Sequence, residues 1–175
     1  MKPCVLMDSS VVIAALESSD LFHPDAVLVF KELFHRRRKN KLKLIIPSIV
    51  FYETMVTLLK KGLERKVVER HLWKFLHLNN IFNVAVIETM AFRLTKNLDQ
   101  ISLANLRTYD FMIASIGLEF DAQILTFDLK MRKKIGQFYP SVYYCSSISS
   151  QNTFGDETPK FLQELDNRLT NVYGG

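Results

Sequence analysis

Short apolar runs alternate with longer stretches of helical periodicity along most of the chain. Runs of mostly apolar character lie at residues 4–7, 44–46, 82–86, 122–127 and 141–145, which is typical of buried strands. Between them, apolar positions recur every three or four residues at 11–16, 24–38, 48–62, 63–78, 88–98 and 106–120. Strands that alternate with helices predict an α/β fold, with a mainly parallel central sheet covered by helices on both faces in three α/β/α layers.

The chain divides into three parts by composition. Residues 1–146 carry the strand and helix pattern, residues 147–158 form a polar, serine-rich linker, and residues 159–175 form an amphipathic helix and tail. The 175 residues are 48% hydrophobic, enough for one core. Helical spacing alone leaves open whether the tail helix packs on its own domain or on a partner.

Composition narrows the class of protein. The apolar runs are far shorter than the roughly 20 residues that cross a bilayer, and Asp8 interrupts the first of them, so we expect no membrane span, no signal peptide and a cytoplasmic location. The two cysteines, Cys4 and Cys145, lie in apolar runs without metal-ligand spacing, which indicates packing residues. The net charge of +5 permits nucleic-acid binding without demanding it.

Two acids directly follow apolar strands. Asp8 comes after the run at 4–7, and Asp128 comes after the run at 122–127. Ligands of an open parallel sheet gather outside the carboxyl ends of its strands. We therefore expect both side chains at one rim of the sheet.

Two further acids lie on helices with apolar neighbours. Glu53 belongs to a helix that we expect Ser48 to cap, and the residues three and four positions away are mostly apolar. Asp110 lies near the start of a helix whose small residues, Ala114 and Gly117, permit close approach to the sheet. Taken alone, Glu53 could be a surface acid at the margin of the apolar face, and Asp110 could simply favour the helix dipole.

Convergence of the four acids on one rim would change this interpretation. Four neighbouring carboxylates repel one another and take up protons unless a divalent cation lies between them. Hard oxygen ligands select Mg²⁺, with Mn²⁺ as a substitute. Such an ion supports attack of water on a phosphodiester without a serine or histidine nucleophile. The acids are Asp8, Glu53, Asp110 and Asp128.

The order of these residues resembles the PIN-domain family, and among its branches the VapC-like toxins. The resemblance rests on Val-Leu-Met-Asp8-Ser-Ser10, on Pro-Ser-Ile-Val-Phe-Tyr-Glu53, on Arg-Thr-Tyr-Asp110-Phe-Met-Ile-Ala-Ser and on Ile-Leu-Thr126-Phe-Asp128, and it spans about residues 3–145. It implies that the four acids form a catalytic, metal-binding quartet and that Ser10 and Thr126 are supporting hydroxyls. Many relatives carry another acid or an aromatic residue shortly after this last Asp, whereas this chain has Leu129 and Lys130 there. The number of bound metal ions, one or two, therefore stays open.

By that resemblance the chain is a Mg²⁺-dependent endoribonuclease, dimeric, and the toxin of a toxin–antitoxin pair whose antitoxin protein covers the site. The alternative is a catalytically silent PIN-like module that binds RNA or a protein partner. A structure-specific DNA nuclease is a weaker alternative, because the chain lacks the long inserted segment such enzymes need.

Basic residues near the acids are candidates for substrate binding. Lys130, Arg132, Lys133 and Lys134 follow Asp128 closely and are predicted to contact RNA phosphates. A second basic cluster at 36–43 is more simply a solvated helix end. The only tryptophan, Trp73, lies in a helical apolar pattern and is predicted to pack in the core.

Overall fold

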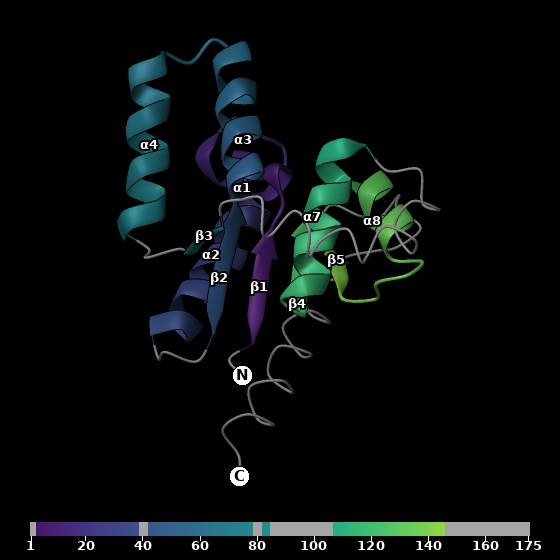
Figure 1. Cartoon of the computed structure of the whole chain (residues 1–175). Coiled ribbons are helices and arrows are strands. Elements are labelled where there is room, and N and C mark those ends of the chain that lie inside the picture. Colours follow the sequence, from purple (N-terminus) through teal and green to yellow (C-terminus); the bar gives the residue numbers. More distant parts are fainter. Residues whose placement is uncertain (1–2, 39–41, 79–81, 85–106, 146–175) are drawn as a thin grey trace.

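A computed structural model of the chain describes residues 3–38, 42–78, 82–84 and 107–145 (Figure 1). Its centre is a five-stranded parallel sheet in the order β3-β2-β1-β4-β5. The strands are β1 (Cys4–Met7), β2 (Lys43–Pro47), β3 (Phe82–Val84), β4 (Ala122–Thr126) and β5 (Val142–Tyr144). The helices of the described residues are α1 (Ser9–Leu16), α2 (His23–Arg38), α3 (Ser48–Lys60), α4 (Arg65–Leu78), α7 (Thr108–Glu119) and α8 (Leu129–Ile135).

Strand β1 forms the middle of the sheet. Its Val5 is in register with Leu44 of β2 on one side and with Gln123 of β4 on the other. Every residue of β1 and β4 is buried. Strands without a solvent-facing side require cover on both faces, which is the usual condition of a parallel sheet.

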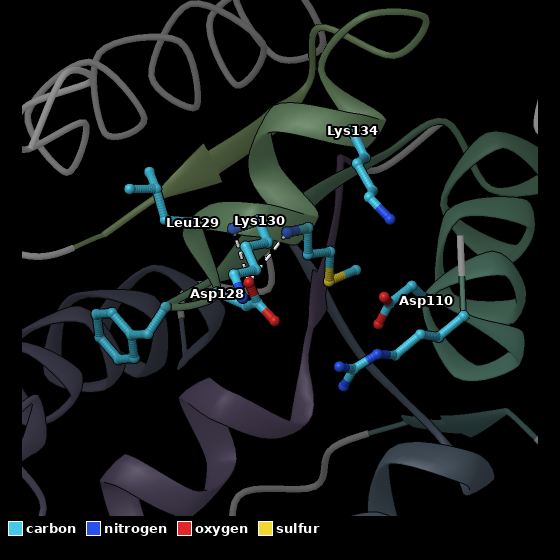
Figure 2. Close-up of a pocket in the computed structure, with 8 residues that line it drawn as sticks. Asp110, Asp128, Leu129, Lys130 and Lys134 are labelled. Atoms are coloured by element: carbon cyan, nitrogen blue, oxygen red, sulfur yellow. Dashed lines mark hydrogen bonds between the residues drawn. The ribbon is translucent and has the colours of Figure 1, made fainter. Parts of the chain in front are cut away.

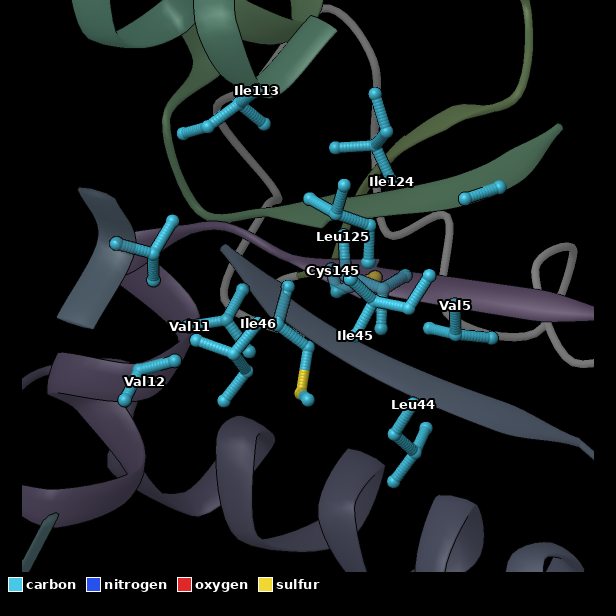
Figure 3. Packing of buried hydrophobic residues seen from close by; sticks show 14 of the residues in the cluster. Val5, Val11, Val12, Leu44, Ile45, Ile46, Ile113, Ile124, Leu125 and Cys145 are labelled. Atoms are coloured by element: carbon cyan, nitrogen blue, oxygen red, sulfur yellow. The ribbon is translucent and has the colours of Figure 1, made fainter. Parts of the chain in front are cut away.

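The helices supply that cover in two layers. The chain runs outward from β1 through β2 to β3, and then returns to β4 and β5 on the other side of β1. Right-handed crossovers therefore place α2 and α7 on opposite faces of the sheet (Figures 1 and 3). Figure 3 shows Ile113 on one side of the strands and Val12 and Leu44 on the other. The predicted three-layer α/β/α fold is confirmed.

Helix α7 lies unusually close to β4 because it carries a glycine at the contact. A Cβ atom at Gly117 would lie 2.5 Å from Cδ1 of Ile124 and 3.6 Å from Cε1 of Tyr139. The absence of a side chain lets the helix backbone approach the strand. This contact fixes the position of the whole helix, including its first turn at the carboxyl edge of the sheet.

Two sequence-based expectations about helices are wrong. Pro47, not Ser48, occupies the N-cap position of α3, with φ −60° and ψ 146°, and Ser48 is already helical. Strand β2 continues through Pro47 and leads directly into α3, so the helix begins one residue earlier than expected. Trp73 is 64% exposed, whereas Val68 and Leu72 of the same helix are buried. Trp73 directly follows Leu72 and so lies about 100° around the helix from it.

Some predictions fall outside the described residues: the helix at 88–98, the linker at 147–158 and the tail helix at 159–175. The short helix α8 was not predicted, because its seven residues are mainly basic. Within the described ranges no helix is long and apolar enough to cross a membrane. Cys4 and Cys145 are buried, as predicted, and both are free.

Candidate active site

The carboxyl edge of β1 and β4 carries two acids side by side. Asp8 directly follows β1, and its backbone N–H donates to the carbonyl of Leu125 in β4 at 3.0 Å. Asp128 lies two residues beyond β4 and caps α8, since its Oδ1 accepts from the N–H groups of Lys130 at 2.7 Å and Met131 at 3.0 Å. After β1 the chain continues to β2 on one side, and after β4 it continues to β5 on the opposite side. This is the switch point at which open α/β sheets form their ligand crevice.

Two hydroxyls hold the Asp8 carboxylate in place. Its Oδ2 accepts from Ser10 Oγ at 2.6 Å and from Thr126 Oγ1 at 2.9 Å. Each hydroxyl also accepts a backbone N–H: that of Phe127 reaches Ser10 Oγ at 2.9 Å, and that of Asp128 reaches Thr126 Oγ1 at 2.8 Å. These bonds tie the ends of β1 and β4 together and fix the orientation of the carboxylate.

All four predicted acids line one cavity of about 560 Å³ at this edge. Asp8 comes from the end of β1, Glu53 from α3, Asp110 from the first turn of α7 and Asp128 from the loop after β4. The remaining lining residues are Ser9, Ser10, Arg107, Thr108 and Tyr109. Residues far apart in sequence therefore meet at one place, and Glu53 and Asp110 are not merely surface acids of their own helices.

The charges in this cavity affect Asp110 most clearly. Partial burial, followed by the neighbouring charges of Asp8, Asp128 and Glu53, raises the pKa of Asp110 from its usual value near 3.8 to about 6. The positive charge of Arg107 acts in the opposite direction. A carboxyl with such a pKa takes up a proton as the pH falls through about 6, and a bound cation would keep it ionised.

Burial also raises the pKa of the two other acids that face the sheet. For Asp8 burial is the largest cause, and the hydroxyls of Ser10 and Thr126 oppose it by stabilising the ionised form. For Glu53, which is half-buried, burial again leads, a hydrogen bond from Ser9 opposes it, and the charge of Asp8 adds to it. The site thus concentrates acids whose ionised forms are disfavoured, which is common where carboxylates bind metal or substrate.

The donor chemistry of the cavity fits a hard divalent cation. Its acidic ligands are all carboxylates, and Mg²⁺ and Mn²⁺ prefer oxygen donors. In the part of the chain that the structure describes, no three side chains of histidine, cysteine, aspartate or glutamate form a group that could hold a metal ion. In this arrangement Asp128 caps α8, where its side chain accepts two backbone N–H groups.

The PIN domain family profile matches residues 5–136, a range that includes all four acids and all six helices of the described residues. The chain belongs to the PIN domain family. Domains of this family are typically nucleases that use divalent metal ions. No curated protein matches the chain.

The PIN domain site contains one cation that the sequence did not single out. Arg107 occupies the N-cap position of α7, three residues before Asp110, and lines the carboxylate cavity. Its charge lowers the pKa of both Asp110 and Glu53. The sequence does show a basic residue one helical turn before Asp110. Its side chain could be assigned to the site only once the position of α7 was known.

A second cavity of the PIN domain, of about 740 Å³, adjoins the acids. Figure 2 shows Asp110 on one side of it and Asp128 with Lys130 on the other, while Lys134 points into it from α8. Of the four basic residues predicted to contact substrate, Lys130 and Lys134 line this cavity, and Arg132 and Lys133 are not among its lining residues. Positions 130 and 134 are one helical turn apart and share a face of α8.

Proposed function

We propose that this PIN domain is a Mg²⁺-dependent endoribonuclease that hydrolyses RNA phosphodiester bonds, with Mn²⁺ as a substitute metal. The observation that carries the proposal is the convergence of Asp8, Glu53, Asp110 and Asp128 on one cavity at the switch point of the sheet. Such acids are costly for the fold in the absence of a cation, as the raised pKa of Asp110 indicates. Membership of a family of nucleases supports the same reaction class.

The proposed roles follow from the surroundings of each side chain. The four acids hold the metal, which when bound lowers the pKa of a water molecule and neutralises charge on the reacting phosphate. Ser10 and Thr126 are positioning residues, because their hydroxyls donate to Asp8 and accept backbone N–H groups. In this proposal Ser10 orients Asp8, and the attacking group is a water molecule. Arg107 lies where it can bind a phosphate oxygen of the substrate.

We further propose that the chain is the toxin of a toxin–antitoxin pair and that an antitoxin protein inhibits it. In this proposal the chain is a homodimer in the cytoplasm. It rests on the resemblance of the four motifs to VapC-like chains. The positive net charge of +5 is compatible with an RNA substrate, since charge attraction to phosphates is independent of sequence.

A catalytically silent module that binds RNA or a protein is the second candidate. Two observations favour it: the acids of the described residues form no metal-holding group, and Arg107 already supplies a positive charge near Glu53 and Asp110. Against it stands the cost of keeping four converging acids in a site that has no cation to bind.

Cleavage of a mixed single-stranded RNA by the wild-type chain and by Asp110→Asn separates the two candidates. Asp121→Asn is the matched control, because Asp121 is exposed at the opposite end of β4 and its φ of 45° suits asparagine as well as aspartate. We expect wild type and control to cut RNA in Mg²⁺ or Mn²⁺ but not in EDTA, and Asp110→Asn to lose at least about a hundredfold in rate. Full activity of Asp110→Asn would overturn the site assignment, and a folded wild-type chain that cuts nothing in either metal would favour the silent module.

A further inference from the structure

The cavity beside the acids combines positive and apolar walls. Its lining residues are Arg107, Asp110, Phe127, Asp128, Leu129, Lys130, Met131 and Lys134. Arg107, Asp110 and Asp128 also line the carboxylate cavity, so the two cavities meet at these three residues. A ligand that reaches from one cavity into the other must pass between the two acids and the arginine.

The lining matches the chemistry of a nucleotide. Lys130, Lys134 and Arg107 supply positive charge for a phosphate, while Leu129 supplies the accessible apolar surface for a sugar or base. Met131, which is 1% exposed, only closes the wall. A volume of about 740 Å³ lies within the usual range of small-ligand sites. An isolated metal ion would need neither the apolar wall nor the lysines.

We infer that this cavity holds the nucleotide next to the scissile phosphate of a single-stranded RNA, with Lys130 and Lys134 binding the phosphate of that nucleotide. The inference rests on the proposed ribonuclease function and adds a substrate subsite to it. Figure 2 shows the side chains of Lys134 and Asp110 extending toward the same space from α8 and α7. A phosphate bound by the lysines therefore lies next to the acids that hold the metal.

The shape of the site favours a single strand. A base that enters a cavity must leave its stack, which costs least when the RNA is unpaired. Phe127 is not a stacking platform for that base, because it is 6% exposed and its ring stacks on Phe22 with centroids 4.9 Å apart. It forms a fixed wall of the cavity, so the lysines carry the recognition of the nucleotide.

Helix α8 provides a matched pair of variants to test this subsite. Lys134 lines the cavity, and its neighbour Lys133, which has the same charge, does not. Each is changed to glutamine in an Asp8→Asn background, which we expect to bind RNA without cutting it and which leaves the lining of the second cavity intact. Circular dichroism confirms that each variant is folded. Binding of a fluorescein-labelled single-stranded RNA in Mg²⁺ is measured by anisotropy at several salt concentrations.

We expect Lys134→Gln to weaken RNA binding about fivefold and Lys133→Gln by less than about twofold. The loss of one phosphate contact should also lower the slope of log Kd against log salt by about 0.7 for Lys134→Gln. In the cutting-competent chain Lys134→Gln should raise KM and leave kcat nearly unchanged, because a flanking contact binds ground state and transition state alike.

Equal effects of the two lysine variants on Kd and on the salt slope would overturn the subsite, because they indicate attraction by overall charge. That result leaves RNA cleavage by the wild-type chain untouched. A wild-type chain that cuts no RNA, combined with selective weakening by Lys134→Gln, has the opposite meaning: the cavity is an RNA-binding site and the ribonuclease proposal fails. The two failures are therefore distinguishable.

Discussion

Replacing Asp110 with asparagine removes a charge that the folded protein holds at a cost. The pKa of this carboxyl rises from about 3.8 to about 6 through partial burial and the repulsion of three neighbouring acids. A rise of about two units corresponds to about 3 kcal/mol. Asp110 is half-buried, so solvent screening reduces this to about 1–2 kcal/mol, and the lost interaction of a first-turn acid with the dipole of α7 removes up to about 1 kcal/mol more. The expected net gain in stability at pH 7 is about 1 kcal/mol.

Urea denaturation in EDTA at pH 7 measures this gain. Asp110→Asn should unfold at a higher urea concentration than wild type, and its Tm should rise by about 2–4 °C. Asp121→Asn, the same chemical change at an exposed position, should leave the free energy of unfolding within about 0.5 kcal/mol of wild type. In Mg²⁺ the order should reverse, because the ion stabilises only a chain that keeps its ligands.

The pH dependence isolates the contribution of Asp110. Between about pH 4 and 6, Asp110 carries a proton in the folded chain but not in the unfolded chain. Asp110 therefore makes the wild-type chain more stable as the pH falls from 7 to 5. Asp110→Asn lacks this contribution, and its difference from wild type should shrink over the same range. A variant that is less stable than wild type at pH 7 in EDTA, or a difference that grows on acidification, would refute this reasoning.

Two more predictions concern the neighbours of these acids. Arg107→Gln should move the acidic limb of the pH–rate profile to higher pH, because the arginine charge lowers the pKa of two of the acids; an unmoved limb would contradict this role. Thr126→Val should lower the free energy of unfolding by about 1–3 kcal/mol in urea denaturation, because a buried N–H loses its acceptor and Asp8 loses a donor. Thr126→Ser keeps the hydroxyl and should keep most of the stability, so equal losses in both variants would argue against the hydrogen bonds as the cause.

The parts of the site that lie on strand ends could be predicted from sequence. Apolar runs locate β1 and β4, the alternation with helices makes the sheet parallel, and parallel strands end at one edge. Asp8 and Asp128 follow from these facts alone. Glu53 and Asp110 required more, because helical periodicity gives the face of a residue but not the place where that face docks. For both residues, the resemblance to the family motifs indicated that they belong to the site.

The basic residues show where sequence reasoning ends. Proximity to Asp128 suggested Lys130, Arg132, Lys133 and Lys134 alike, but of these the structure places only 130 and 134 among the residues that line the cavity. The helix was not recognised, so its one-turn spacing could not be used. Arg107 lies just before α7, and the effect of its charge on two acids depends on where that helix lies, which Gly117 helps to set at its contact with β4.

Metal-dependent RNA cleavage by a refolded chain tests the central claim most directly. The wild-type protein is purified under denaturing conditions to remove any bound inhibitor, refolded, freed of metal with EDTA, and given Mn²⁺ or Mg²⁺ with a labelled single-stranded RNA. Asp8→Asn prepared in the same way controls for contaminating nucleases. Cutting that returns with metal in wild type but not in Asp8→Asn is the predicted result, and a folded wild-type chain that cuts no better than Asp8→Asn would contradict the account.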